Sequence, residues 1–230
     1  MGFEKKHGGY HIEKEFDKLI NEINEKKTPN LIIDLRYNSG GDPLMGGRMA
    51  AQLIDRPFKV YERLILTPPG KPEYLSCMSD RLVMRLRTFG VKEVNDHYEK
   101  VHFDRGLKLV QPATNRYKGK IYVITGPMTV STSSMFCSYL KGQSNVVFVG
   151  QETKGGINYL CAHESCEIRL PYSGVVATFG LQIVEVNKGS SDHEKSEGLI
   201  PDKCIEYSVE EFLAGKDKEM EWIKNDLLRK

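Results

Sequence analysis

The sequence predicts an α/β fold built on a parallel sheet. Two segments each run from a buried strand through a turn into a helix, and this repeated order is the main reason for the prediction. The first has an apolar strand at 31–35, a glycine turn at 37–42 and a helix at 44–53; the second has a strand at 120–125, then a hydroxyl-rich turn and a helix. Strand, turn and helix in this order are typical of parallel sheets, in which backbone amides gather at the carboxyl ends of the strands.

The elements around these two units follow from hydrophobic periodicity. Apolar residues recur at helical spacing over 12–26, which predicts an amphipathic helix that ends before Pro29. A second amphipathic helix is expected over 210–229, interrupted near Gly215. Further strands are expected at 60–66, 145–149, 166–171 and 174–184, and a further helix near 79–89.

Length and composition indicate one large domain with an insertion. The chain has 230 residues, of which 40% are apolar, and a chain of this size buries roughly 70 to 75% of its unfolded surface. A core of that size needs neither disulfides nor metals. Residues 70–115 are charged, contain histidines and show little periodicity, so we expect a surface insertion or lid there.

The charge balance and the apolar runs exclude two classes of protein. There are 33 Lys and Arg residues against 31 Asp and Glu, and a net charge of +2 is too small for the basic face of a nucleic-acid-binding protein. The longest apolar runs, such as 146–149, fall far short of the roughly 18 residues that a membrane-spanning helix needs. We therefore expect no nucleic-acid partner and no membrane span. The first residues contain no apolar signal-peptide core, so the compartment is not indicated.

The cysteines do not indicate a metal centre. Five cysteines form an odd set without a CxxC pair, which favours neither a disulfide framework nor a zinc knuckle. Cys161, His163 and Cys166 lie close together in the sequence, but no fourth ligand is evident. We therefore expect loop residues here, no metal site and no cofactor.

Two turns invite a catalytic interpretation. The hydroxyl cluster at 129–134 stands between a buried strand and a helix, where a nucleophilic serine is exposed beside the first amides of the helix. The turn Ser39-Gly-Gly41 ends another strand, where glycine lets backbone N–H groups approach a developing oxyanion. Each turn also has a structural interpretation, since serines before a helix are usually N-caps and a glycine after a strand is usually part of a turn.

Several motifs in order along the chain resemble one family. Leu31-Ile-Ile-Asp-Leu-Arg-Tyr-Asn-Ser-Gly-Gly41 resembles the signature hydrophobic-Asp-Leu-Arg-x-Asn-x-Gly-Gly of the C-terminal-processing, or tail-specific, serine peptidases. Relatives of that family include the tricorn protease core and retinoid-binding repeats. The other motifs similar to family segments are Ser131-Thr-Ser-Ser-Met-Phe136, Val149-Gly-Gln-Glu-Thr-Lys-Gly-Gly156, Leu170-Pro-Tyr-Ser173, Gly198-Leu-Ile-Pro-Asp202 and Gly215-Lys-Asp217.

The resemblance implies a crotonase-like or ClpP-like ββα core and peptide-bond hydrolysis through an acyl-enzyme. Ser131 falls on the position of the family nucleophile, and Ser133 is the nearby alternative. The oxyanion donors implied are the backbone N–H of Gly40 or Gly41 together with that of Thr132. Asp34 and Arg36 are interpreted as structural residues that shape the loop through hydrogen bonds.

The general base implied by the resemblance depends on the branch of the family. Members with a Ser-Lys dyad carry lysine one residue after the first glycine of the turn, where this chain has Gly156; Lys154, two residues earlier, is a possible substitute. The tricorn-like branch uses histidine with a carboxylate instead. The candidates are then His11 or His7 as base and Glu197 or Glu194 as acid, with His97, His102 and His163 as outside candidates.

The resemblance leads to a serine endopeptidase that attacks an extended polypeptide or its carboxyl-terminal tail. Its expected partner is a polypeptide substrate, and homo-oligomerisation is left open. On this hypothesis residues 1–230 are the catalytic core, without the PDZ-like module of the family. The alternative is a non-catalytic relative that binds a peptide or ligand without a complete base. A crotonase-type acyl-CoA enzyme fits the Ser131 and Pro201-Asp202 motifs poorly.

Overall fold

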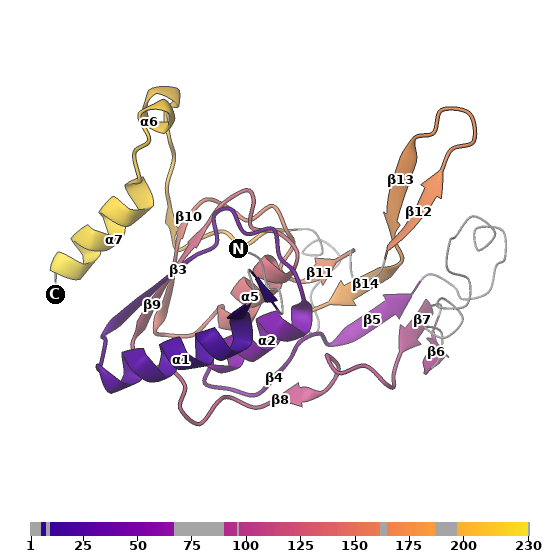
Figure 1. The fold of residues 1–230 in the computed structure, drawn as a ribbon, viewed down its shortest axis with the longest axis horizontal. Helices are drawn as coiled ribbons and strands as arrows, with labels where there is room; N and C mark the ends of the chain where they lie inside the picture. The colour runs from indigo at the N-terminus through magenta and orange to yellow at the C-terminus, as the bar shows by residue number, and fades with distance from the viewer. Residues whose placement is uncertain are drawn as a thin grey trace. The chain divides into compact units, whose positions relative to one another are not determined.

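The chain divides into two compact units, drawn as a ribbon in Figure 1. The computed structural model describes residues 6–7, 10–66, 90–95, 97–161, 165–186 and 197–229. The first unit comprises 1–58, 110–157 and 197–230, and the second comprises 59–109 and 158–196. The expected helix near 79–89 lies outside the described residues.

The first unit contains the predicted parallel sheet. Its four strands lie in the order β15, β10, β9, β3, and every neighbouring pair is parallel. They are β3 (Asn30–Asp34), β9 (Lys120–Thr125), β10 (Val146–Gly150) and β15 (Lys203–Cys204). The α/β fold class predicted from the two strand, turn and helix units is therefore confirmed.

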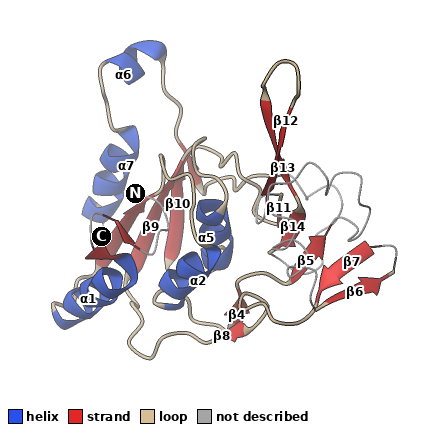
Figure 2. Cartoon of the chain, turned by 45° about the vertical axis from the view of Figure 1, so that its right-hand side comes forward, coloured by secondary structure: helices blue, strands red, loops and turns tan. Residues whose placement is uncertain are grey.

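Helices cover both faces of this sheet, as the two views in Figures 1 and 2 show. Side chains alternate along β9, so Tyr122 and Ile124 pack with Ile223 of α7 on one face, while α1, α2 and α5 cover the other. The predicted break near Gly215 separates α6 from α7. The helices are α1 (Ile12–Glu25), α2 (Pro43–Ala51), α5 (Thr132–Leu140), α6 (Val209–Leu213) and α7 (Lys218–Leu228).

The register of the sheet brings three turns to one edge. Asp34 lies opposite Ile124, and Thr125 lies opposite Gly150, so β3, β9 and β10 end side by side. All three strands run in the same direction, which places the segments that follow them at the same edge. The glycine turn, the hydroxyl cluster and the turn after Gly150 therefore meet there.

A short hairpin precedes the first helix. It consists of β1 (Lys6–His7) and β2 (Tyr10–His11), which pair as antiparallel strands with Lys6 opposite His11. His11 is also the residue before α1, where its backbone is extended and its side chain makes no capping hydrogen bond.

The second unit is built on antiparallel strands. Its five-stranded sheet has the order β11, β14, β5, β7, β6, and a separate ribbon joins β12 to β13. Within the expected insertion, β6 and β7 are therefore strands of this sheet. The expected strand at 174–184 divides at Leu181 into β13 and β14. The strands are β5 (Arg63–Leu66), β6 (Val91–Val94), β7 (His97–Lys100), β11 (Tyr159–Leu160), β12 (Ser165–Arg169), β13 (Val176–Gly180) and β14 (Gln182–Glu185).

Two further strands, β4 (Phe58–Lys59) and β8 (Leu109–Val110), pair where the chain passes from one unit to the other. Within the part of the chain that the structure describes, no helix combines the length and apolar character needed to cross a membrane.

Candidate active site

Ser131 stands immediately before α5 in a strained backbone conformation. Its φ is 57° and its ψ is −131°, a combination that non-glycine residues rarely adopt and that persists only where the surrounding structure holds it. Its hydroxyl makes no capping hydrogen bond to the helix. Ser131 therefore occupies the N-cap position of α5 without capping it through its side chain, and it stands on a sharp turn into the helix, a position in which other serine hydrolases hold their nucleophile.

Gly40 lies directly against Ser131. A Cβ atom at position 40 would come within 2.8 Å of Ser131 Cβ, 2.9 Å of the Thr132 backbone nitrogen and 3.0 Å of the Val130 carbonyl oxygen. Gly40 also has φ +103°, in the left-handed region that favours glycine. Sterics and backbone conformation thus both require glycine at this position.

Gly40 leaves room beside the Thr132 amide, which a Cβ at position 40 would approach within 2.9 Å. This amide has no acceptor among the described residues, whereas those of Ser133 and Ser134 donate to the carbonyls of Val130 and Ser131. The first amides of a helix lack partners within the helix and carry its positive dipole end, so they attract a developing negative charge.

A hydrogen bond ties the two halves of the site together. The Thr132 hydroxyl donates to the Gly41 carbonyl oxygen at 2.6 Å, which links the start of α5 to the glycine turn. The structure therefore brings Gly40, Gly41, Ser131 and Thr132 into one cluster.

Asn38 organises the glycine turn, a role that the sequence analysis did not assign. Its Oδ1 accepts the Gly40 amide at 3.0 Å and the Ser133 hydroxyl at 2.6 Å. An asparagine two residues before glycine is the signal of an Asx turn that would have found this residue. Since the Gly40 amide is engaged with Asn38, the geometry favours the Gly41 amide as the oxyanion donor on this side.

Ser133 differs from Ser131 in its burial and in the hydrogen bonding of its hydroxyl. Its side chain is fully buried and its hydroxyl is engaged with Asn38, whereas Ser131 is only half-buried. Ser134 is also fully buried, and its hydroxyl donates to the Thr129 carbonyl at 3.1 Å. The geometry thus favours Ser131 over Ser133.

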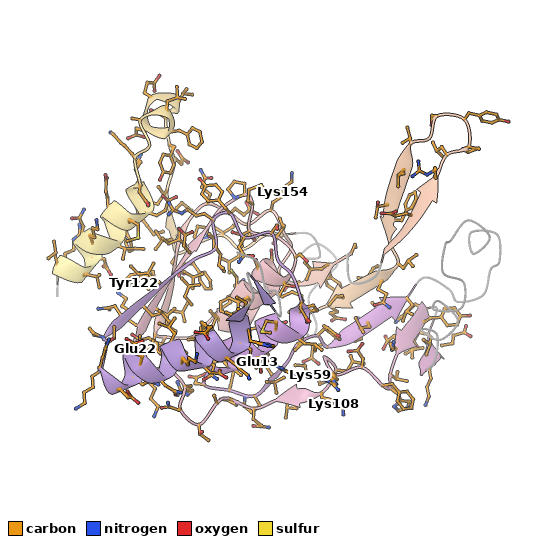
Figure 3. The ribbon with its side chains drawn as sticks, viewed as in Figure 1. Glu13, Glu22, Lys59, Lys108, Tyr122 and Lys154 are labelled. Carbon is orange, nitrogen blue, oxygen red and sulfur yellow. The ribbon has the colours of Figure 1, made fainter. Side chains whose placement is uncertain are left out.

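The turn after β10 packs against the nucleophile loop through glycine. The Gly155 amide donates to the Thr129 carbonyl at 3.2 Å, and a Cβ at Gly155 would lie 3.0 Å from the Ser131 nitrogen. Lys154 is exposed, and its side chain lies at the outer edge of the ribbon in Figure 3. The turn therefore presents glycine, and not the Lys154 amine, to Ser131.

Glu197 lies beside the same turn. Its carbonyl oxygen accepts the Ile157 amide at 3.2 Å, and the neighbouring Gly198 packs against the Thr153 carbonyl. The Glu197 side chain is exposed, and Glu194 lies outside the described residues.

No candidate base contacts the nucleophile in the described part of the chain, since no His, Lys, Asp or Glu side chain there forms a hydrogen bond with the Ser131 hydroxyl. His11 is exposed, and for His7 only the backbone in β1 is described. Of the outside candidates, His97 is hydrogen-bonded to Glu99 at 2.6 Å and His102 is exposed, and both belong to the second unit, while His163 is not described.

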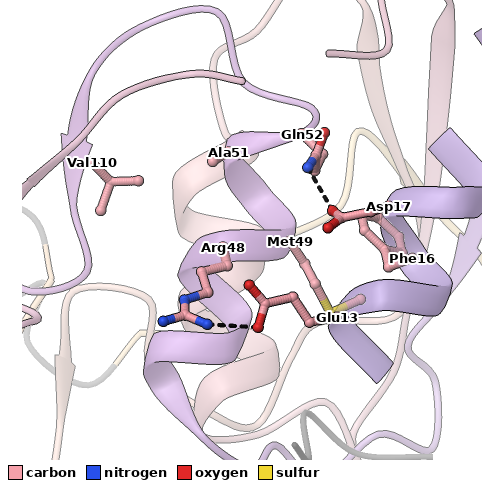
Figure 4. A pocket seen from close by; sticks show the side chains of 8 residues that line it. All are labelled: Glu13, Phe16, Asp17, Arg48, Met49, Ala51, Gln52 and Val110. Atoms are coloured by element: carbon pink, nitrogen blue, oxygen red, sulfur yellow. Dashed lines mark hydrogen bonds and ion pairs between the residues drawn. The ribbon is translucent and has the colours of Figure 1, made fainter. Parts of the chain in front are cut away.

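A cavity of about 220 Å³ lies between α1 and α2 (Figure 4). Its polar side chains are paired with one another, since Arg48 contacts Glu13 at 2.6 Å and Gln52 contacts Asp17 at 2.7 Å. It is lined by the second half of α2, whereas the glycine turn precedes the first residue of that helix. The cavity is therefore separate from the Ser131 cluster.

The described residues contain no group of three or more His, Cys, Asp or Glu side chains that could hold a metal ion. Cys161 is exposed, and Cys137 is buried, which raises the pKa of its thiol well above the usual range.

Comparison with known proteins shows the family. A sequence model of peptidase family S41 matches residues 2–202. The chain belongs to peptidase family S41. This confirms the resemblance to C-terminal-processing peptidases found in the sequence.

Solved structures share the S41 fold at low sequence identity. A protein from Parabacteroides merdae assigned as a peptidase matches 93% of this chain with 17% identity and a TM-score of 0.57. Mature CPAF matches 90% with 17% identity and a TM-score of 0.62. This chain covers 56% and 44% of those two chains, so it spans about half of their length. A comparison with curated protein sequences gives no match.

Proposed function

We propose that this S41 chain is a serine endopeptidase that forms an acyl-enzyme on Ser131. The observation that carries the proposal is the strained Ser131 immediately before α5, with Gly40 beside the Thr132 amide, which has no acceptor among the described residues. Nucleophile and oxyanion donors are thus held next to one another before any substrate binds, which is the preorganisation that acyl transfer needs.

The reaction follows from this arrangement. A base removes the proton of the Ser131 hydroxyl, and Oγ bonds to the scissile carbonyl carbon. The carbonyl oxygen becomes an oxyanion that accepts hydrogen bonds from the Thr132 and Gly41 amides. The C–N bond then breaks, the protonated base gives its proton to the departing amine, and water releases the acyl group from Ser131 by the same steps.

His11 is the base in this proposal, and Glu197 is the acid that orients it. The support is the family resemblance and the placement of the Glu197 carbonyl beside the turn that packs on Ser131. A hydrogen bond from base to nucleophile is not required in the free protein, because such contacts often tighten only when substrate binds.

The substrate class is an extended polypeptide or its carboxyl-terminal tail. An extended chain can add to a sheet edge through main-chain hydrogen bonds with little demand on sequence, which suits an endopeptidase of this family.

One observation favours a second candidate function. The Ser131 hydroxyl contacts no titratable side chain in the described residues, and the family lysine position is Gly156. A relative that binds a peptide without cleaving it would have this arrangement.

A fluorophosphonate serine probe separates the two functions. We expect labelling of the folded protein, complete loss of labelling in Ser131→Ala, and labelling within about threefold of wild type in the matched control Ser133→Ala. Ser133 is the right control because it lies on the same turn with its hydroxyl committed to Asn38. An unlabelled wild-type protein with a cooperative unfolding transition would instead support the peptide-binding alternative.

A further inference from the structure

Arg36 is surrounded by carboxylates from two distant parts of the chain. Its Nη1 and Nη2 atoms donate to the two carboxylate oxygens of Asp217 at 2.9 and 3.1 Å. Its Nη2 also donates to Asp34 at 2.7 Å, and its Nη1 lies 3.3 Å from Glu219. Such a two-pronged contact fixes both the direction and the distance of the partner, which a lysine cannot reproduce.

The partners on the α7 side form a network of their own. Glu219 is only 3% exposed and accepts a hydrogen bond from the Tyr207 hydroxyl, which in turn accepts the Lys218 amide at 3.0 Å. A buried carboxylate is costly to ionise unless a cation and hydrogen bonds compensate for the lost water. Arg36, whose side chain is 19% exposed, supplies that cation.

Arg36 is joined to the active-site loop through its neighbours in the chain. The Asn38 amide donates to the Leu35 carbonyl at 3.1 Å, and the Thr129 hydroxyl donates to the same carbonyl at 2.7 Å. The Asn38 side chain in turn holds the Gly40 amide. Arg36 thus stands two positions before Asn38, whose side chain holds the glycine turn.

We infer that Arg36 is a positioning residue through which α7 braces the glycine turn of the active site. This inference rests on the proposed function and adds a region to it, because α7 lies beyond the residues 2–202 that the family model matches. Asp34 holds Arg36 from its own strand, while Asp217 and Glu219 hold it from α7. The start of α7 thereby fixes where Asn38, and with it the Gly40 and Gly41 backbone, stands relative to Ser131.

The test measures the maximum rate of Ser131 acylation by the fluorophosphonate probe and the probe concentration that gives half of that rate. In Arg36→Gln we expect the maximum rate to fall about 10- to 100-fold, since small misplacements of catalytic groups have effects of this size. The half-saturating concentration should stay within about twofold, because Arg36 does not touch the probe.

Asp226→Asn is the matched control. Asp226 anchors the other end of α7 by accepting hydrogen bonds from Lys120 at 2.7 Å and from the Tyr122 hydroxyl at 2.6 Å. This variant should lower the melting temperature while leaving the acylation rate within about twofold at temperatures where it is folded. Equal losses of rate in Arg36→Gln and Asp226→Asn would overturn the inference, since general loosening of α7 would then explain both.

Milder variants keep the inference testable if Arg36→Gln does not fold. Asp217→Asn and Glu219→Gln each remove a charge facing Arg36 while keeping the shape of the side chain, and each should slow acylation about three- to tenfold. Wild-type rates in both would overturn the inference while leaving the proposed function intact. Absence of wild-type labelling would overturn the proposed function and the inference together, so the two failures are distinguishable.

Discussion

The two sides of the expected catalytic machinery are held very differently. On the nucleophile side, a Cβ atom at Gly40 would come within 3.0 Å of Ser131 and Thr132, and hydrogen bonds to Asn38 and Gly41 hold this part of the site together. On the base side, His11, Lys154 and Glu197 are all exposed, and none of their side chains forms a hydrogen bond with Ser131.

The two sides differ because strand pairing in the sheet places the residues of one side next to each other, whereas it does not place the candidate base His11. The nucleophile side is built where two neighbouring parallel strands end, so sheet register alone brings its parts together. His11, the base in the proposed mechanism, lies at the end of β2 and immediately before α1, and neither element belongs to this sheet. Mutations on the two sides should therefore differ in how they affect activity and stability.

Replacing the proposed base, His11, is expected to give the largest loss of labelling rate. His11→Ala should reduce the rate of fluorophosphonate labelling about 10³-fold, because loss of a general base costs roughly 10² to 10⁴ in rate. Its melting temperature should change little, since the His11 side chain is exposed and caps no helix amide.

Lys154→Ala is the matched control for this experiment, since Lys154 is exposed as well. It should label within about twofold of wild type. The reverse result, with labelling lost in Lys154→Ala and retained in His11→Ala, would assign the base to the turn after β10 and remove the contrast between the two sides.

A smaller loss of activity, joined to a loss of stability, is expected at Gly40. In Gly40→Ala the new methyl group would meet Ser131 Cβ and the Thr132 nitrogen at less than 3.0 Å. We expect labelling to fall about 10²- to 10³-fold as the oxyanion donors are displaced. Urea denaturation should show a loss of about 2 to 4 kcal/mol from overpacking and left-handed strain.

Gly142→Ala separates those two causes. Gly142 also has a positive φ, +82°, but a Cβ there would meet nothing within 4 Å. It should show the cost of strain alone, about 1 kcal/mol, with labelling unchanged. Equal effects of the two alanine substitutions would show that the close approach of Gly40 to Ser131 is unimportant.

The smallest effect is expected at the contact between Arg36 and α7, as a change in how the free energy of unfolding depends on pH in acid. Burial acts to raise the pKa of Asp217, but hydrogen bonds from Arg36 and from the Met220 amide outweigh it and hold this pKa below its usual value. A lowered pKa in the folded state gives stability that is present above the unfolded pKa and is lost as the pH falls through the folded one.

The wild-type protein should therefore lose more stability between about pH 5 and pH 3 than Asp217→Asn does, because only the wild type has this carboxylate to protonate. Urea denaturation at several pH values measures the difference. Parallel pH profiles for the two proteins would show that the Asp217 carboxylate contributes nothing to acid sensitivity.

Much of the first unit could be predicted from the sequence because its signals are local. The strands at 31–35 and 120–125, the helix over 12–26 and the break near Gly215 follow from hydrophobic periodicity and glycine, and the structure confirms all four elements. The strand at 31–35 is however half-buried and not fully buried, because β3 lies at the edge of the sheet. The expected strand at 174–184 was less accurate, because its division into two strands depends on different pairing partners for β13 and β14.

In the candidate site too, local motifs could be predicted from the sequence, whereas contacts made by packing could not. The glycine turn and the hydroxyl cluster are motifs of adjacent residues, so the sequence pointed to Ser131, Gly40 and Thr132. The family resemblance favoured Ser131 but kept Ser133 as an alternative, since burial and the hydrogen bond of Ser133 to Asn38 are properties of the packed structure. The proposal of Gly41 rather than Gly40 as an oxyanion donor also depends on Asn38, which accepts the Gly40 amide.

By itself, the sequence determined the α/β class, the order of the strand, turn and helix units, and the family to which the chain belongs. Each of these follows from local patterns or from the order of motifs along the chain. Only the tertiary structure decided that Gly40 stands against Ser131, that Lys154 faces outward and that Arg36 joins the active-site loop to α7. Each of these joins residues far apart in the chain or depends on the direction in which a side chain points. Long-range contacts and side-chain directions are both fixed only when the helices and strands pack together.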